Sequence, residues 1–253
     1  MMRAKRTVMN AWRTAAMTLV ALSALSAASA QNLVQDPSFE TTISNNTYGS
    51  NPTTWFANQS FGGGAWQVIS GSIDLVRVPG FGGPPGPGND QFVELNGNEP
   101  GAIRQEVEVT VGGLYNFSFY YGGYAATASG VNAADDYVLS AQARIIRRND
   151  DNTTSLIHSA VVSLSIGAAG GINGSWISTP YTAQFVLSPG RYYVEFESRH
   201  FGGTDANGNT IPAYFGPRVD GVNLSLVPEP ASMVALGAGL TGLLGLRRRR
   251  ARG

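Results

Sequence analysis

The chain has 253 residues, no cysteine, and 17 basic and 17 acidic residues. Nine of the basic residues lie in the first 13 and last seven positions, so residues 31–226 keep eight arginines, no lysine and 16 acidic residues, a net charge of −8. The lack of cysteine excludes disulfides and thiolate chemistry, and an acidic segment without a basic stripe argues against nucleic acid as a partner.

The N-terminus has the three parts of a secretory signal peptide. Basic residues are concentrated in residues 3–13, an apolar stretch runs from Ala15 to Leu25, and Ala28-Ser29-Ala30 forms an A-x-A cleavage site. We therefore predict a signal peptide over residues 1–30, export through the Sec pathway, and cleavage between Ala30 and Gln31.

Residues 31–226 are long enough for one domain with a sizeable core, and period-two alternation dominates them. Between Ile103 and Val111, one face carries Ile103, Val107, Val109 and Val111 and the other carries mainly charged residues. The same pattern recurs around Tyr115–Tyr121 and Arg191–Glu197. Further strand candidates are 66–77, 91–95, 137–147, 155–165, 176–187 and 213–226. We predict an all-β fold, an antiparallel β-sandwich of jelly-roll type with nine or ten strands.

Four long loops, at 78–90, 122–136, 166–175 and 199–212, separate the predicted strands. The apolar C–H face of a sugar ring stacks well on an aromatic ring, so aromatic residues in or beside loops are the candidate ligand contacts. These are Trp55, Tyr124, Phe201 and Tyr214. Trp66 and Trp176 lie in alternating strands, and we assign them to the core.

Six stretches, in this order, resemble the galactose-binding-like jelly rolls of choice-of-anchor and carbohydrate-binding modules. They are NLVQDPSFE (32–40), WQVISGSIDLV (66–76), QFVELNG (91–97), AIRQEVEV (102–109), GLYNFSFYYG (113–122) and GPRVDGVNLSL (216–226). The first resembles the opening strand of those modules and the last resembles their closing strand. Asp36-Pro37 replaces their usual Asn-Gly and Glu94 replaces a shorter Asp, which weakens the transfer of any specific ligand.

The same resemblance implies a structural calcium ion, Ca²⁺, between the acidic residue that ends the first motif and that of the closing strand. In this chain they are Glu40 and Asp220. Two carboxylates brought together by a sheet repel each other unless a cation neutralises them, and Ca²⁺ prefers oxygen ligands.

The chain contains neither the G-x-S-x-G nor the H-E-x-x-H motif, and neither histidine has a recognisable catalytic partner by spacing. We therefore predict a non-catalytic protein that binds or organises polysaccharide. One alternative is a purely structural surface protein with protein partners. Another is a glycan-active hydrolase that uses two carboxylates from distant strands.

Residues 227–253 have the three parts of a membrane-sorting tag. Pro228, Glu229 and Pro230 should stay extended and accessible to a processing enzyme, because proline disfavours helix at itself and at the preceding residue. Residues 231–246 are uncharged and mostly apolar, so we predict a transmembrane helix spanning roughly 24 Å of a hydrocarbon core about 30 Å thick. The positive charges that should hold the C-terminus in the cytoplasm are Arg247, Arg248, Arg249 and Arg250.

This order of Pro-Glu-Pro, short apolar helix and arginine cluster resembles the PEP-CTERM sorting signal. The resemblance implies a precursor anchored in the inner membrane, recognition by an exosortase, and release or transfer to the cell surface or the extracellular matrix. The alternative is an ordinary C-terminal membrane anchor.

Overall fold

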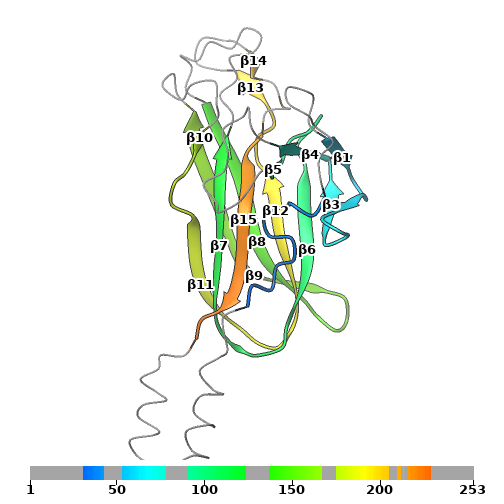
Figure 1. The fold of residues 1–253 in the computed structure, drawn as a ribbon, viewed down its shortest axis with the longest axis vertical. Helices are drawn as coiled ribbons and strands as arrows, with labels where there is room; N and C mark the ends of the chain where they lie inside the picture. Colours follow the sequence, from blue (N-terminus) through cyan, green and yellow to red (C-terminus); the bar gives the residue numbers. More distant parts are fainter. Residues whose placement is uncertain are drawn as a thin grey trace, which may run out of the picture. The chain divides into compact units, whose positions relative to one another are not determined.

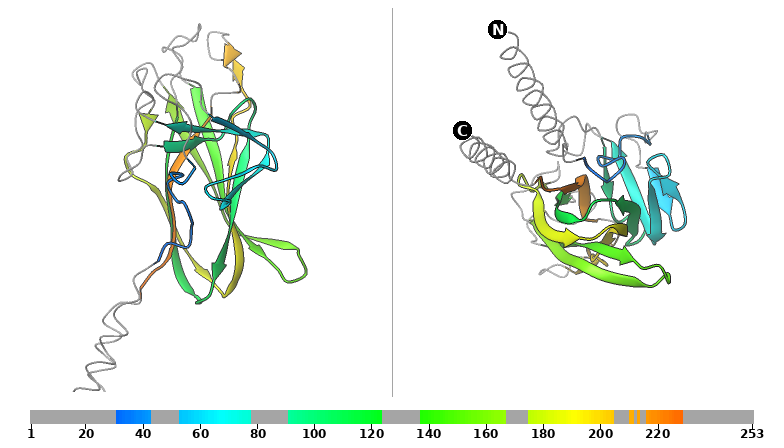
Figure 2. Two further views of the ribbon diagram at one scale, coloured as in Figure 1. Left: turned by 45° about the vertical axis from the view of Figure 1, so that its right-hand side comes forward. Right: turned by 90° about the horizontal axis from the view of Figure 1, so that it is seen from below.

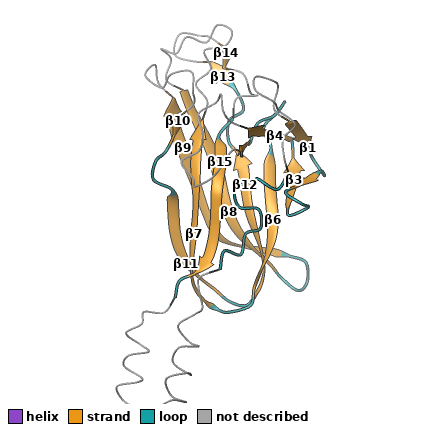
Figure 3. Cartoon of the chain, viewed as in Figure 1, coloured by secondary structure: helices purple, strands orange, loops and turns teal. Residues whose placement is uncertain are grey.

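The computed structural model describes residues 31–42, 53–77, 91–123, 137–166, 175–204, 210–211, 213 and 216–228. Every regular element in these ranges is a β-strand (Figure 3). None of the described segments forms a helix that is long and apolar enough to cross a membrane. The predicted signal peptide, transmembrane helix and arginine cluster lie outside the described residues. The chain divides into two compact units, Met1–Gln31 with Leu226–Gly253, and Asn32–Ser225, and the second holds the sandwich.

Two antiparallel sheets form a sandwich, as Figures 1 and 2 show. Sheet A has the order β1 (Thr53–Phe56), β4 (Ser72–Arg77), β5 (Gln91–Glu94), β15 (Arg218–Leu226), β7 (Gly113–Gly123) and β10 (Ser175–Trp176), with β11 (Tyr181–Leu187) also paired to β7. Sheet B has the order β2 (Ser60–Phe61), β3 (Trp66–Ser70), β6 (Ala102–Val109), β12 (Gly190–Ser198), β8 (Tyr137–Arg148) and β9 (Thr154–Ile166). A separate ribbon pairs β13 (Gly203–Thr204) with β14 (Thr210–Ile211). The predicted all-β jelly-roll sandwich is confirmed.

The alternation seen in the sequence builds the core between the sheets. In β6, Val107 and Val109 are buried, whereas Glu106 and Glu108 are exposed. The predicted inward faces of β7 and β12 are buried in the same way, except that Tyr121 of β7 is only half-buried. Val111 is an exception, because β6 ends two residues earlier and the valine is left 56% exposed.

The predicted strand 66–77 is two strands that belong to different sheets. Gly71 separates β3 from β4 and has a φ of +57°. A Cβ atom at this position would lie 1.9 Å from the carbonyl oxygen of Pro100. Only glycine fits here, so this residue fixes the point where the chain passes from sheet B to sheet A.

The predicted strand 176–187 is likewise divided, into β10 and β11. Trp176 pairs with Gly122 on β7, and its ring meets that of Phe92 edge-on at a centroid distance of 5.3 Å. Trp66 is fully buried, as predicted. Trp176 is only half-buried, so it lies at the margin of the core and not within it as predicted. The predicted last strand, 213–226, begins only at Arg218.

The opening segment forms no regular strand, contrary to the resemblance, and makes a single bridge between Asn32 and Ser225. The Asn32 side chain holds it in place by donating to the Val222 carbonyl at 2.9 Å and accepting from the Leu224 amide at 2.9 Å. Further along the segment, Phe39 is fully buried with its ring centroid 5.2 Å from that of Trp66. The segment therefore closes the core without extending a sheet.

Candidate functional site

The outer side of sheet B carries a set of polar side chains, here called the polar face: Gln67, Arg104, Glu106, Gln142, Arg144, Arg148, Ser159, Tyr193, Glu195, Glu197 and Arg199. Strand register places five of them in one row across β3, β6, β12, β8 and β9, in the order Gln67, Arg104, Glu195, Arg144 and Ser159. Because neighbouring strands lie about 4.8 Å apart, their side chains can meet across the sheet.

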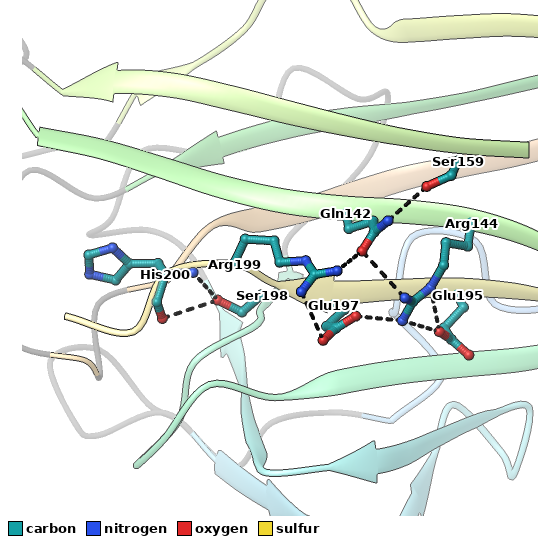
Figure 4. Close-up of polar contacts among 8 residues, drawn as sticks. All are labelled: Gln142, Arg144, Ser159, Glu195, Glu197, Ser198, Arg199 and His200. Carbon is teal, nitrogen blue, oxygen red and sulfur yellow. Dashed lines mark hydrogen bonds and ion pairs between the residues drawn. The ribbon is translucent and has the colours of Figure 1, made fainter.

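Arg144 joins two carboxylates of β12 (Figure 4). Its Nε donates to Glu195 Oε1 at 2.8 Å, and its Nη2 lies 2.5 Å from Glu197 Oε2. Glu195 and Glu197 are two residues apart, so they project from the same side of the strand. The Glu195 side chain is only 8% exposed, which means that Arg144 supplies the charge partner that a buried carboxylate requires.

Gln142 extends these contacts to the next strand. Its amide donates to the Ser159 hydroxyl at 2.8 Å, and its Oε1 accepts from Arg144 Nη1 at 3.3 Å and also from Arg199. Arg199 also lies 3.7 Å from Glu197. The polar groups from β12 to β9 thus hold one another in fixed orientations (Figure 4).

Tyr193 is the aromatic member of the polar face. The guanidinium carbon of Arg104 lies 4.7 Å from its ring centroid, within the range of a cation–π contact. Arg148 Nη1 donates to Glu106 Oε2 at 2.9 Å. This hydrogen bond, together with the neighbouring Tyr193 hydroxyl, raises the pKa of Arg148 above its usual value.

A surface of this kind suits a sugar polymer. Planar guanidinium, amide and carboxylate groups hydrogen-bond to hydroxyls, and an aromatic ring offers a face for the C–H side of a sugar. The sequence predicted that alternating polar residues of β12 face outward, but not which residues of β6 and β8 lie beside them. Sequence reasoning therefore missed this face as a site.

Of the four aromatic residues predicted as ligand contacts, the two that the structure describes, Trp55 and Phe201, lie outside the polar face. Trp55 is in β1 and not in a loop, and its ring packs against Phe61 at a centroid distance of 5.9 Å. Its Nε1 is buried without a hydrogen-bond partner. Phe201 follows β12 and is 67% exposed, consistent with a contact surface. Tyr124 and Tyr214 lie outside the described residues, and a ligand role for all four stays a prediction.

Glu40, one of the two predicted calcium ligands, contacts the start of β5. Its Oε1 accepts from the Gln91 amide at 2.8 Å. The Gln91 side-chain amide lies within hydrogen-bonding distance of three oxygens, the Phe39 carbonyl at 3.1 Å, the Thr42 carbonyl at 3.2 Å and Glu40 Oε2 at 3.4 Å. Carboxylate and carbonyl oxygens are the ligands that Ca²⁺ prefers, so the local chemistry fits this ion.

Asp220, the second predicted ligand, is fully buried on β15. The preceding residue, Val219, pairs with Val93, so β15 runs beside the strand that begins at Gln91. Among the described residues, no group of three or more His, Asp or Glu side chains is arranged to hold a metal. A calcium ion would therefore need backbone carbonyls as well, and its presence stays a prediction.

An acidic pair lies in sheet A, where the partly buried Asp74 of β4 is opposite the buried Glu94 of β5. Burial raises the pKa of both carboxyls, although the charge of Arg218 and the Gly216 amide act in the opposite direction on Glu94. The Gly216 amide binds Glu94 Oε1 at 3.1 Å and Arg218 Nε binds Glu94 Oε2 at 3.2 Å. Glu94 therefore anchors the closing strand, a structural role.

The family model described as the PEP-CTERM protein-sorting motif matches residues 226–250. The predicted PEP-CTERM sorting signal is confirmed. This motif implies an exported protein that is sorted to the cell surface. No curated protein matches the chain in sequence.

Several solved structures are similar in fold. TmCBM61 in complex with beta-1,4-galactotriose has a TM-score of 0.41 and 15% identity over 79% of this chain and 99% of that one. The CBM22-1 xylan-binding domain from Paenibacillus barcinonensis has a TM-score of 0.41 and 12% identity, covering 70% and 95%. A family 35 carbohydrate binding module from Clostridium thermocellum has a TM-score of 0.36 and 15% identity, covering 70% and 100%.

Proposed function

We propose that this protein is a non-catalytic surface or matrix protein that binds or organises extracellular polysaccharide. The chain enters the Sec pathway through residues 1–30, residues 231–246 anchor the precursor in the inner membrane, and an exosortase acts at Pro228–Pro230. The β-sandwich is the part that meets the polymer.

The polar face of sheet B is the observation that carries this proposal. Five of the eight arginines in residues 31–226 lie on this side of sheet B, namely Arg104, Arg144, Arg148, Arg191 and Arg199. Four carboxylates, Glu106, Glu108, Glu195 and Glu197, lie among them. The face is therefore close to neutral on a domain whose net charge is −8, which favours a neutral or weakly acidic polysaccharide.

The test is calorimetric titration of the protein with exopolysaccharide purified from the producing cell. Tyr193→Ala should weaken binding about tenfold, the scale of a lost aromatic contact. Gln142→Ala should also weaken binding, whereas Gln184→Ala, an exposed glutamine on β11, is the matched control and should leave the affinity unchanged. Equal affinities in all three variants would exclude the polar face as the site. Absence of any binding would favour the structural alternative.

The hydrolase alternative is tested by turnover of the same polysaccharide carrying a reducing-end label. Asp74 and Glu94 are described carboxylates that face each other, but both Glu94 oxygens are already bound. We expect no product above the rate in buffer. Product formation above that rate, abolished by Glu94→Gln in a variant whose melting temperature shows that it still folds, would establish catalysis and overturn the proposal.

A further inference from the structure

Among the strands that the structure describes, β9 is the last strand at one edge of sheet B. Among the described strands it pairs with β8 alone. Its 13 residues, Thr154–Ile166, contain no Asp, Glu, Lys, Arg, Pro or Gly. Edge strands of soluble proteins are usually short or protected by charges and proline, because their free backbone groups can pair with another strand. Figure 2 shows the β8–β9 hairpin extending from the side of the sandwich.

A bulge limits the regular part of this edge. The register with β8 shifts between Ile145, which faces His158, and Ile146, which faces Leu156. Ile157 is therefore the extra residue, and regular pairing continues from His158 toward Ile166. Within this stretch, Val161 is 60% exposed although it is apolar and central.

The sequence around Val161 is nearly symmetric, reading Ser159-Ala160-Val161-Val162-Ser163. In an antiparallel pair of two such strands with the axis at Val161, Val161 faces itself. Ser159 then faces Ser163, and Ala160 faces Val162. Serine therefore faces serine and apolar residues face apolar residues on both sides of the sheet. A two-fold interface requires this self-complementarity. We propose that two copies of this chain pair edge to edge through β9, antiparallel about Val161, to join their two B sheets into one.

The charge distribution favours the β9 edge as the place where two copies meet. Two domains that each carry −8 repel each other, and close approach is least costly where the edge itself carries no charge. The two flanking serines are already oriented, because Ser163 contacts Ser140 at 2.9 Å and Ser159 accepts from Gln142 at 2.8 Å.

Pairing of this size is weak in solution. The regular overlap spans seven residues on each strand, His158–Leu164, which buries less than the roughly 1,200–2,000 Å² of a stable interface. Attachment to a surface raises the effective concentration of the copies, so that weak pairing still operates there. The inference does not depend on polysaccharide binding.

The register is tested by cysteine cross-linking of the full chain in detergent, because the native chain contains no cysteine. Val161→Cys should form a disulfide-linked dimer under mild oxidation, since the two positions meet at the axis. A mixture of Ser159→Cys and Ser163→Cys should cross-link, whereas Ser159→Cys alone should not, because its two copies would be about 13 Å apart. The control is Val186→Cys, on the β11 edge of sheet A and 72% exposed. The proposed pairing would be refuted if Val161→Cys cross-linked no faster than Val186→Cys. It would also be refuted if Ser159→Cys alone cross-linked as fast as the mixture.

Sedimentation equilibrium of the full chain gives an independent measurement. Val161→Lys should raise the dimer dissociation constant at least tenfold, because it places two positive charges at the axis. Val186→Lys should leave the constant unchanged. Both valines are exposed, and unchanged melting temperatures would show that both variants fold. A chain that is monomeric at every accessible concentration, or equal behaviour of the two variants, would overturn the inference.

Discussion

Arg218 and Glu94 are partners in register across β15 and β5, and they form an ion pair in which Arg218 Nε lies 3.2 Å from Glu94 Oε2. The arginine side chain is 1% exposed, and its guanidinium carbon lies 4.6 Å from the Phe92 ring centroid. The last strand of the sandwich is thus held to the middle of sheet A by a buried charge pair.

We expect Arg218→Met to destabilise the fold by about 3–5 kcal/mol, because it leaves the Glu94 carboxylate buried without its counter-charge. Chemical denaturation of the exported domain measures this loss. The double variant Arg218→Met/Glu94→Leu should recover most of the stability, since no lone charge remains. A double variant as unstable as the single one would show that the ion pair itself is required.

Gly71→Ala should destabilise the protein by about 3 kcal/mol or more, because it combines a left-handed backbone with a clash. Its Cβ atom would lie 1.9 Å from the Pro100 carbonyl oxygen. Gly64 is the matched control, with a φ of +92° and no atom within 4 Å of an added Cβ. Gly64→Ala should lower the free energy of unfolding by only about 1 kcal/mol, because it strains the backbone without causing a clash. Equal losses in denaturation midpoint would contradict the steric argument.

The sequence predicts those features of the fold that depend on residues close together in the chain, such as the buried face of a single strand. Alternation over Tyr115–Tyr121 is long enough to identify β7 and its buried face. The two-residue strand β2 offers no period to detect. The buried apolar positions change from even numbers before Gly71, at Trp66 and Val68, to odd numbers after it, at Ile73 and Leu75, and the prediction of one strand over 66–77 missed this change. The row that joins Gln67, Arg104 and Glu195 depends on strand register, which links distant parts of the chain. No local pattern carries that information.

The pH dependence of stability should include a contribution from His158, which joins the two sheets. Its Nε2 lies 2.8 Å from the Tyr181 hydroxyl on β11, and its ring stacks on Phe185 at a centroid distance of 5.2 Å. Burial lowers the pKa of His158 below 6.5. The unfolded chain therefore binds the proton more readily, so this contribution is fully present above about pH 6.5 and is lost as the pH falls below it through the lower pKa of the folded state.

Urea denaturation between pH 7.5 and pH 5 measures this effect. His158→Gln should flatten the dependence over that range, whereas wild-type protein should lose stability on acidification. The second histidine, His200, is unchanged in the variant and serves as the internal control for general histidine protonation. An identical pH slope in the two proteins would contradict the assignment.

Calcium should stabilise the exported domain if Glu40 and Asp220 hold the ion with nearby carbonyl oxygens. A ligand that binds only the folded state adds about 2.7 kcal/mol when its concentration is 100 times the dissociation constant. We expect the melting temperature to fall on chelation, and Asp220→Asn to reduce that response. Identical melting curves with millimolar Ca²⁺ and with chelator would rule the ion out.

Surface sorting should depend on Pro228, Glu229 and Pro230, because the two prolines keep this short segment extended and free of helix next to the apolar stretch. Replacing all three with alanine would allow helix to continue through the processing point. We expect the triple variant to accumulate in the inner membrane as a precursor that retains residues 231–253, as measured by fractionation and intact mass. Val227→Ala, which keeps the Pro-Glu-Pro sequence, is the control and should be processed normally. If the triple variant reaches the surface with the same mass and amount as wild type, this segment does not direct processing.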